Sequence, residues 1–434
     1  MNDEHPDEEF DCVIVGGGVH GTHLAGRLLE DTELDRHAVA VVDPNDRLLA
    51  SFRRKADACG MDALRSTYVQ HVGTEAFGLE SFAEATGRED ELRSTVDYPD
   101  RPSLDLFLDY ADRVIGSNGL DSLHRRATVE RIERLSGGGF RLRTSAGRID
   151  TATCVLAVGH GGRYRLPEWA RDVDGVDHVW GDFDPATDPA RTVVVGGGIT
   201  AVQLACTLSG RESAGKRAAA GEQEPVTLVS RHPLEWAVSE ADPPWLNWTH
   251  IERELHCHPR ASKARLDAVR EARHSATVPP YLYDPLDERV GDGRLRLLEG
   301  NIEAATATRN DITLALREGE TLEADRVVCA TGFEPVFRHP FVERLAAELG
   351  LARGHRGLPM LDDATLAWET TDGEPLPLYV SGALALAVVG PYAPNVPGAK
   401  RAADRITRAV EATRTEPPRS SVVSSGPRET GNPF

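Results

Sequence analysis

Lysine is scarce in this chain: of its 49 basic residues, 4 are Lys and 45 are Arg. The basic residues are outnumbered by 69 Asp and Glu, which gives a net charge of −20. This charge argues against nucleic acid or an anionic membrane as a partner. An acidic composition poor in Lys is typical of proteins from salt-loaded cytoplasms, where hydrated carboxylates keep the surface soluble.

Closely spaced cysteines are also missing. The six Cys are scattered over 434 residues without a Cys-x-x-Cys pair, so the redox dithiol that disulfide reductases need is excluded. We interpret them as small buried hydrophobic residues. The cluster His256-Cys257-His258 has no second ligand pair at zinc spacing, so we expect no metal site.

No apolar run is long enough for a membrane span. The longest, Val380–Val389, has half of the ~20 residues that a transmembrane helix needs. The acidic start, Met1–Glu9, differs from the basic and then apolar pattern of a signal peptide. We therefore expect a soluble, cytoplasmic protein without a membrane partner, and leave open whether it forms oligomers.

Hydrophobic residues make up 40% of the chain, enough for substantial cores. The length suggests two or three domains at ~150 residues each. Short β-branched runs alternate with segments of helical periodicity, which predicts an α/β fold. From residue 128 to 158 the period drops to two, with Gly-rich turns, which predicts a β-meander.

One local pattern occurs twice. The apolar run Asp11–Val15 leads into Gly16-Gly17-Gly18-Val19-His20-Gly21, a helical segment, and a second apolar run, Val39–Val42, that ends at Asp43. About 180 residues later, Thr192–Val195 leads into Gly196-Gly197-Gly198-Ile199-Thr200-Ala201, a helix, and the strand Val226–Val229. Each copy reads as strand, glycine turn, helix and strand, the order of a dinucleotide-binding βαβ unit.

The glycines have distinct expected roles at a diphosphate. Gly16 makes the tight turn, Gly18 allows close approach, and Gly21 allows the helix to pack on the strand; Gly196, Gly198 and Ala201 take these places in the second copy. Helix starts offer unsatisfied N–H donors and a partial positive charge, by which so acidic a protein can hold an anionic cofactor.

The residue after each second strand discriminates between nucleotides. Asp43 can accept hydrogen bonds from a ribose diol, which suits FAD or NAD. Arg231 follows the second copy and suits the 2′-phosphate of NADPH. Because the chain is rich in Arg, an Arg at this position can also occur without such a role, and NADH stays open as an alternative.

At this point the sequence resembles a known group, the flavin-dependent monooxygenases with two dinucleotide-binding domains. The resemblance covers about Asp11 to Ala412. Cys154–Gly159 resembles the group's first crossover strand, Gly175–Trp180 resembles its linker with a His, and Asp325–Phe333 resembles the segment that crosses back. The resemblance implies two Rossmann-like (three-layer ββα) domains, FAD at the first glycine turn, and NADPH at the second.

Implied boundaries follow the same resemblance. We expect a disordered acidic start at 1–9, an FAD-binding domain formed by 10–185 and 323–412, an inserted NAD(P)H-binding domain at 186–322 with a helical insertion at 232–290, and a disordered tail at 413–434. The segment Gly210–Glu224 is expected to be a surface loop. The expected cofactor-binding residues are Gly16, Gly17, Gly18, Val19, His20, Gly21, Asp43, Val129, Gly159, Gly196, Gly198, Ile199, Thr200, Arg231, Thr331, Gly332, Gly398 and Ala399.

Within the group, Pro244–Val290 is most similar to lysine and ornithine N-hydroxylases. The chain departs from them at Ala276 and Thr277, which stand where those enzymes have Asn and Tyr, and it has no Lys near Met61–Gln70. Ser381 and its neighbours also lack the Asp that many such flavoproteins place there.

The resemblance implies a monooxygenase that forms a C4a-hydroperoxyflavin and oxygenates a small molecule, with amine N-hydroxylation as one option. The alternatives are a FAD/NAD(P)H oxidoreductase that does not activate oxygen and a flavin-binding redox sensor without turnover. His178 is the single candidate for a catalytic side chain, against a structural role; His20 and His23 are expected to be packing residues or neighbours of the diphosphate.

Overall fold

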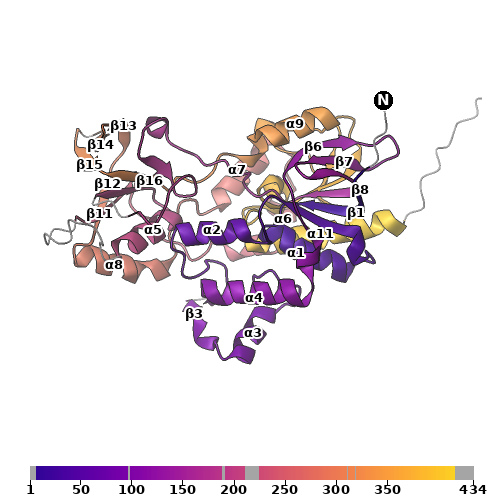
Figure 1. The fold of residues 1–434 in the computed structure, drawn as a ribbon, viewed down its shortest axis with the longest axis horizontal. Helices are drawn as coiled ribbons and strands as arrows, with labels where there is room; N and C mark the ends of the chain where they lie inside the picture. Colours follow the sequence, from indigo (N-terminus) through magenta and orange to yellow (C-terminus); the bar gives the residue numbers. More distant parts are fainter. Residues whose placement is uncertain are drawn as a thin grey trace, which may run out of the picture.

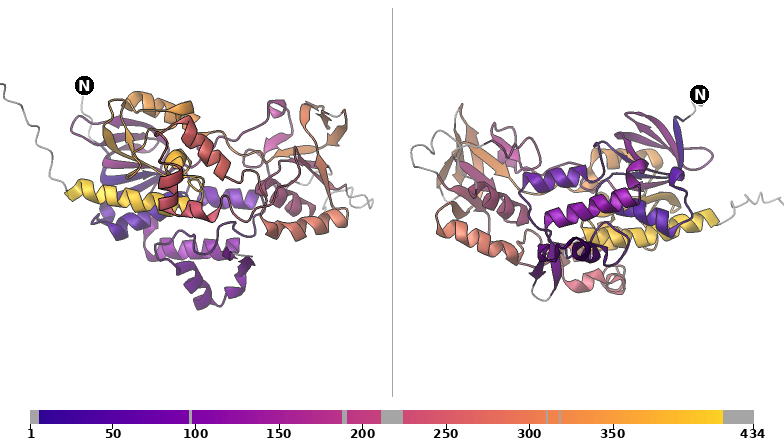
Figure 2. Two further views of the ribbon diagram at one scale, coloured as in Figure 1. Left: turned by 180° about the vertical axis from the view of Figure 1, so that it is seen from behind. Right: turned by 60° about the horizontal axis from the view of Figure 1, so that its bottom comes forward.

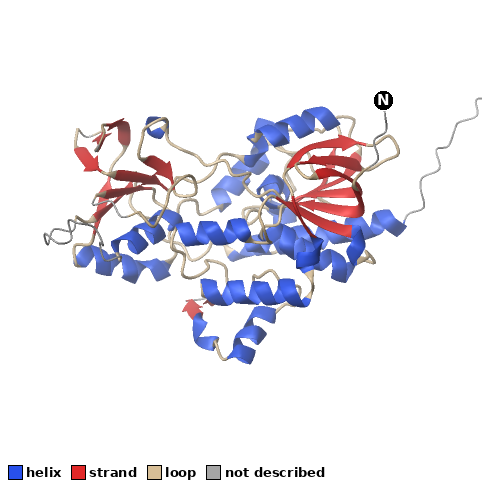
Figure 3. Ribbon diagram, viewed as in Figure 1, coloured by secondary structure: helices blue, strands red, loops and turns tan. Residues whose placement is uncertain are grey.

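The computed structural model describes residues 6–95, 98–187, 191–210, 224–309, 311–317 and 319–415. Within these residues the chain forms two lobes, each built around a sheet with parallel strands, that lie side by side along the long axis (Figure 1). Figure 3 shows a group of strands in each lobe with helices beside it. Residues 211–223 of the predicted loop, 1–5 of the predicted N-terminal segment and 416–434 of the predicted tail lie outside the described residues. Of the remaining residues of the two terminal segments, Glu8 and Glu9 belong to the strand Glu8–Val15, and 413–415 belong to the helix Val396–Thr415.

The first lobe contains a sheet of eight described strands, with the order β17-β18-β8-β1-β2-β5 and β6 and β7 beside β8. β1, β2, β5, β8 and β18 are parallel, whereas β17, β6 and β7 pair antiparallel. The predicted meander is therefore confirmed. The strands are β1 (Glu8–Val15), β2 (Val39–Asp43), β5 (His124–Arg126), β6 (Val129–Arg134), β7 (Phe140–Thr144), β8 (Gly147–Leu156), β17 (Ala367–Glu369) and β18 (Pro375–Val380).

The second lobe contains a parallel sheet with the order β12-β11-β10-β16-β9 and a separate antiparallel sheet, β13-β14-β15. The strands are β9 (Val176–His178), β10 (Thr192–Val195), β11 (Val226–Ser230), β12 (Leu295–Glu299), β13 (Ile302–Ala307), β14 (Ile312–Leu316), β15 (Thr321–Ala324) and β16 (Arg326–Cys329). β9 and β16 lie in sequence outside the predicted range 186–322, yet both pair in this sheet. A short hairpin of β3 (Leu92–Thr95) and β4 (Tyr98–Pro102) lies apart, beside α3 and α4.

Helices cover both sheets. α1 and the C-terminal helix α11 pack against each other along the first lobe, where Arg27 on α1 pairs with Asp404 on α11 (Figure 2). The helical insertion predicted for 232–290 contains α6, α7 and most of α8. The helices are α1 (Val19–Asp31), α2 (Ala50–Ala58), α3 (Gly78–Thr86), α4 (Leu104–Ser117), α5 (Ile199–Ser209), α6 (Trp248–Glu254), α7 (Lys263–Ala272), α8 (Tyr283–Gly291), α9 (Pro340–Leu349), α10 (Leu386–Val389) and α11 (Val396–Thr415).

The central strands are mostly apolar because both faces of a parallel sheet are covered. In the second lobe, α5 and α8 pack on one face of the sheet, and β13, β14 and β15 pack on the other. Every residue of β2, β10 and β16 is buried. None of the described helices is both long and apolar enough to cross a membrane.

Two of the chain segments that connect the lobes, one after β8 and one after β16, run side by side. The main-chain N–H of Arg165 donates to the carbonyl of Gly332 at 2.9 Å, and Tyr164 and Phe333 form an antiparallel bridge. The ring of His160 stacks on that of Phe333 with centroids 3.9 Å apart. The lobes are therefore joined by a paired backbone connection, held in part by stacked rings.

Candidate functional site between two glycine turns

The first glycine turn lies between β1 and α1. Gly16 has a φ of 113°, and a Cβ there would meet the carbonyl oxygen of Ala157 at 2.4 Å. A Cβ at Gly21 would lie 1.8 Å from the carbonyl oxygen of Gly16, so the helix packs directly on the turn. At Gly18, by contrast, a Cβ would meet nothing within 4 Å. The turn therefore requires Gly16 and Gly21 for folding, while Gly18 leaves open space at the start of α1.

The second turn repeats this geometry. The N–H of Gly196 donates to the carbonyl of Val229 at 2.9 Å, as the N–H of Gly16 donates to that of Val42 at 2.9 Å. Gly198 and Gly18 are the N-cap residues of α5 and α1, and neither has a side chain to accept from the N–H groups of the first turn. Each lobe thus presents a helix start with free backbone donors at the carboxyl edge of its sheet, which is the arrangement that binds diphosphates.

Asp43, at the end of β2, is buried and lies against the first turn. Its carboxylate accepts from the N–H of Gly17 at 2.7 Å and from the N–H of Asn45 at 2.9 Å. Arg231, after β11, is exposed at the corresponding place of the second lobe. The structure therefore puts an acceptor beside the first turn and a cation beside the second.

A cavity of about 1010 Å³ lies between the lobes. From the second lobe it is lined by the whole glycine turn, and from the first by Val19 and His20 at the start of α1. A smaller cavity of about 450 Å³ shares Arg231 and His232 with it. Pockets of ~300–1,000 Å³ hold small-molecule ligands, so the main cavity has room for one.

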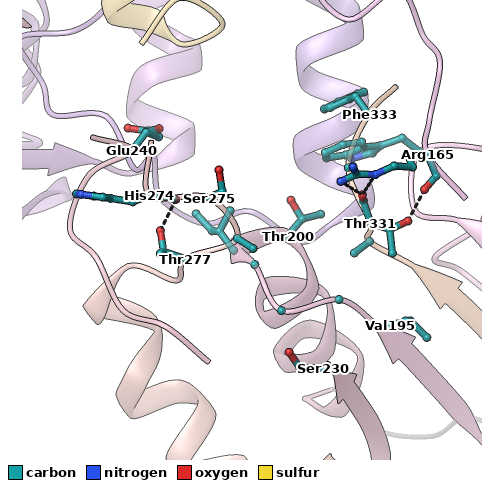
Figure 4. Close-up of a pocket in the computed structure, with 18 of the residues that line it drawn as sticks. Arg165, Val195, Thr200, Ser230, Glu240, His274, Ser275, Thr277, Thr331 and Phe333 are labelled. Carbon is teal, nitrogen blue, oxygen red and sulfur yellow. Dashed lines mark hydrogen bonds between the residues drawn. The ribbon is translucent and has the colours of Figure 1, made fainter. Parts of the chain in front are cut away.

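The cavity has different walls on its two sides (Figure 4). Thr200 lies at the centre, with Glu240 and His274 on one side and Thr331 and Phe333 on the other. The side chain of Thr277 donates to the carbonyl of His274 at 2.8 Å, which shapes the first wall. Arg165 donates to the carbonyl of Thr331 at 3.0 Å on the second.

Two arginines bring positive charge to this cavity. Arg65 donates to the carbonyls of Ala237 and Ser239, both at 2.7 Å, and to Thr277. Arg273 donates to the carbonyl of Pro391 and to the side-chain oxygen of Asn395. Burial lowers the pKa of both guanidinium groups. The hydrogen-bond acceptors of these two cations are neutral, and the nearby carboxylate of Glu240 raises the pKa of both. An anionic ligand could therefore form charge-assisted hydrogen bonds with them.

His20 links the start of α1 to the other end of the first lobe. Its Nδ1 lies 2.8 Å from the Oγ of Ser381, and its Nε2 lies 3.2 Å from the carbonyl oxygen of Asn395. Burial lowers its pKa to about 4, so the ring is neutral at pH 7. A carbonyl only accepts, so Nε2 carries the proton and Nδ1 accepts from Ser381.

His178 does not lie in a linker, as the sequence suggested, but at the end of β9, because its segment pairs with β16 in the second sheet. Its ring stacks on Tyr164 with centroids 4.8 Å apart, and burial lowers its pKa to about 4. It is not among the residues that line the cavity. A catalytic role for His178 stays a prediction, and the position favours packing between the lobes.

The predicted cofactor residues divide into two sets. Those that line the cavity are Val19, His20, Gly196, Gly198, Ile199, Thr200, Arg231, Thr331 and Gly332. Those that lie outside its lining are Gly16, Gly17, Gly18, Gly21, Asp43, Val129, Gly159, Gly398 and Ala399. α11 begins at Val396, so Gly398 lies inside the helix, against the carbonyls of Tyr392 and Ala393.

Sequence reasoning missed the polar wall formed by Arg65, Glu240, Arg273 and Asn395. These residues come from separate segments. Two weak signals exist: Arg273 lies three positions before Ala276 in the segment that is compared with the N-hydroxylases, and Arg65 is a cation in the stretch 61–70, where those enzymes place a Lys.

Comparisons with known proteins agree with this architecture. Residues 13–161 match a family model described as FAD-NAD(P)-binding. The predicted FAD/NAD(P)-binding domain is thereby confirmed for the first part of the chain. No curated protein matches the chain in sequence.

Solved structures match over nearly the whole chain. The ornithine N-hydroxylase of Kutzneria sp. 744, in a structure with reduced FAD, NADP⁺ and L-ornithine, has a TM-score of 0.72 at 17% identity, covering 94% of this chain and 100% of that one. The L-lysine 6-monooxygenase of Pseudomonas syringae has a TM-score of 0.70 at 20% identity, with coverage of 94% and 99%. The bacillithiol disulfide reductase of Staphylococcus aureus has a TM-score of 0.59 at 13% identity, with coverage of 94% and 99%. The predicted fold and the resemblance to flavoprotein monooxygenases are confirmed at the level of architecture.

Proposed function

We propose that this chain is an FAD-dependent, NAD(P)H-using oxidoreductase. The observation that carries the proposal is the repeated glycine turn. The second turn lines the cavity, and the helix that follows the first turn contributes His20 to the lining. Two such helix starts facing one cavity would bring two dinucleotides into contact. The N-hydroxylase neighbour with reduced FAD and NADP⁺ supports this assignment.

The residues around the first turn fit FAD. Gly18 leaves open space where a diphosphate would approach, and Asp43 has carboxylate lone pairs beside the turn for a ribose hydroxyl. When bound, the flavin would supply the electron-transfer chemistry. The chain would supply orientation through the turn and the neutral environment of His20.

The residues around the second turn fit a nicotinamide dinucleotide. The turn from Gly196 to Thr200 lines the cavity, and Arg231 lies where both cavities meet. An exposed guanidinium at this place would bind a 2′-phosphate, so NADPH is the proposed reductant and NADH the alternative.

We further propose that the enzyme is a monooxygenase acting on a small molecule. The two N-hydroxylases superpose with TM-scores of 0.70–0.72, against 0.59 for the disulfide reductase and 0.58 for the flavin-containing monooxygenase of Stenotrophomonas maltophilia, so the similarity supports the N-hydroxylase type in particular. No described cysteine lines the cavity, so the dithiol chemistry of a disulfide reductase has no support here. Ala276 and Thr277 stand beside the second turn, in place of the residues expected for an amino-acid substrate, so substrate identity is open to a screen.

The test is rapid-mixing spectroscopy on protein purified at high salt and loaded with FAD. We expect NADPH to bleach the visible flavin band without oxygen, and the oxidised spectrum to return after a lag when oxygen is added. An immediate return with stoichiometric hydrogen peroxide would favour the non-oxygenating oxidoreductase. Failure of NADPH and NADH to bleach a bound flavin would favour a redox sensor without turnover.

A matched variant separates the two nucleotide sites. Gly198→Glu places a carboxylate at the start of α5, where a Cβ would lie 3.3 Å from Ala276. We expect this variant to bind FAD normally but to lose reduction by NADPH. Reduction at the wild-type rate would contradict the assignment of the second turn.

A further inference from the structure

Asn395 joins three separate segments of the chain through three different polar groups. Its side-chain Nδ2 donates to the Oε1 of Glu240 at 3.0 Å, and its Oδ1 accepts from Arg273 at 3.1 Å. Its main-chain carbonyl accepts from the Nε2 of His20 at 3.2 Å. The residue therefore couples the helical insertion of the second lobe to the start of α1, although the partners are 122 to 375 positions away in sequence.

The first-lobe end of this link is closely fitted. His20 follows Gly18 by two residues, so it lies in the first turn of α1, where the proposed FAD diphosphate binds. The ring also contacts Ser381, and a Cβ at Gly382 would lie 3.9 Å from it. A shift of Asn395 would therefore act on the ring, and through it on the helix start.

The second-lobe end of the link faces the cavity. Glu240 and Arg273 both line it, together with the glycine turn that begins α5. Burial lowers the pKa of the Arg273 guanidinium group and the carboxylate of Glu240 raises it, so the two residues interact electrostatically. An anionic ligand in the cavity would be attracted to Arg273 and repelled by Glu240. Such a ligand competes with the Oδ1 of Asn395 for Arg273.

We propose that Glu240, Arg273, Asn395 and His20 form a positioning link, by which a nucleotide in the cavity alters the environment of the flavin at the first turn. His20 is the positioning residue: it acts through its bonds to Asn395 and Ser381 rather than on the substrate. The inference rests on the proposed function, since it requires FAD at the first turn and a nicotinamide nucleotide at the second.

The test uses FAD-loaded protein and NADP⁺ as the probe. The readouts are the dissociation constant of FAD and the change in flavin absorbance at saturating NADP⁺. His20→Phe keeps a ring but removes both hydrogen bonds, whereas His20→Gln keeps an N–H that can donate to Asn395. Glu240→Ala breaks the far end of the link without touching the first turn.

We expect Glu240→Ala to bind FAD within about threefold of the wild type. We expect both His20→Phe and Glu240→Ala to lose at least four-fifths of the NADP⁺-induced change in flavin absorbance. We expect His20→Gln to retain at least half of the change. If His20→Phe fails to fold or to bind FAD, the NADP⁺-induced change measured in Glu240→Ala tests the link instead. A full spectral change in Glu240→Ala, or in a folded His20→Phe, would overturn the link.

Failure of the proposed function has a different signature. Wild-type protein that binds FAD and is reduced by NADPH, but whose flavin spectrum ignores NADP⁺, refutes the link and leaves the function standing. Wild-type protein that binds neither nucleotide refutes both.

Discussion

The carboxylate of Asp43 accepts a hydrogen bond from the main-chain N–H of Gly17 at 2.7 Å, across 26 positions of sequence. This bond closes the first βαβ unit on itself, because it ties the end of β2 to the turn that follows β1. The other carboxylate oxygen accepts from Asn45. Asp43 thus shapes the turn in addition to its proposed contact with a ribose.

Replacing Asp43 by Ala should weaken both folding and cofactor binding. Loss of a buried, charge-assisted hydrogen bond costs ~1.5–3 kcal/mol, and we expect the affinity for FAD to fall at least tenfold. Urea unfolding and FAD titration measure the two effects. Asp46, exposed and only three positions away, provides the control: Asp46→Ala should change neither. Wild-type FAD affinity in Asp43→Ala would contradict the assigned role.

A pair of glycine substitutions separates folding from binding at the first turn. Gly18→Ala should leave the melting temperature unchanged, since its Cβ meets nothing within 4 Å, yet lower the affinity for FAD at least tenfold if a diphosphate fills that space. Gly21→Ala should destabilise the fold itself, because its Cβ would lie 1.8 Å from a backbone oxygen. Thermal unfolding and FAD titration of both variants provide the check. Unaltered FAD binding by Gly18→Ala would place the diphosphate elsewhere.

Arg231 should discriminate between the two nicotinamide nucleotides. We expect Arg231→Ala to raise the KM for NADPH at least tenfold, about 1.4 kcal/mol, with little change for NADH, because only NADPH carries a 2′-phosphate. Arg296, exposed on β12 and outside both cavities, gives the matched control. An equal loss with both nucleotides would assign Arg231 to the diphosphate rather than to the 2′-phosphate.

Stability should fall as the pH drops from about 6.5 towards 4. Burial lowers the pKa to about 3 for His23 and to about 4 for four other histidines, His20, His71, His160 and His178, so these rings stay neutral in the folded state. In the unfolded chain the same rings take up protons near pH ~6.5. The unfolded state therefore binds more protons than the folded state in this window, which favours unfolding.

Urea unfolding at several pH values in molar salt, which screens the net negative charge, measures this slope. His23→Asn should reduce the slope, because its amide can still donate to the carbonyl of Val72 but does not titrate in this range. A stability that rises on acidification in high salt would contradict the prediction.

The sequence was sufficient to predict the architecture because its signals are local. A glycine turn, the strand before it and the helix after it lie within about 25 residues, so Gly16–Gly21 and Gly196–Ala201 could be recognised as units. Asp43 could be recognised because it directly follows the apolar run of β2. All of these features depend on residues that are close to one another in sequence.

The polar wall of the cavity could not be predicted in this way. Asn395 and His20 are 375 positions apart, and their contact depends on how α11 packs beside α1. Gly398, a predicted cofactor-binding residue, lies inside α11, which begins at Val396, and outside the lining of the cavity. Long-range packing, which leaves no local pattern, decided both.

The paired segments that join the lobes have a mechanical consequence. Because Arg165 bonds to Gly332 and the rings of His160 and Phe333 are stacked, neither connection can bend alone. Rotation of one lobe against the other would have to bend both backbones. It would also disturb α7, where Leu266 packs in the core of the first lobe and Arg265 bonds to Asp363. The distance between the two helix starts is therefore constrained at several points of the chain.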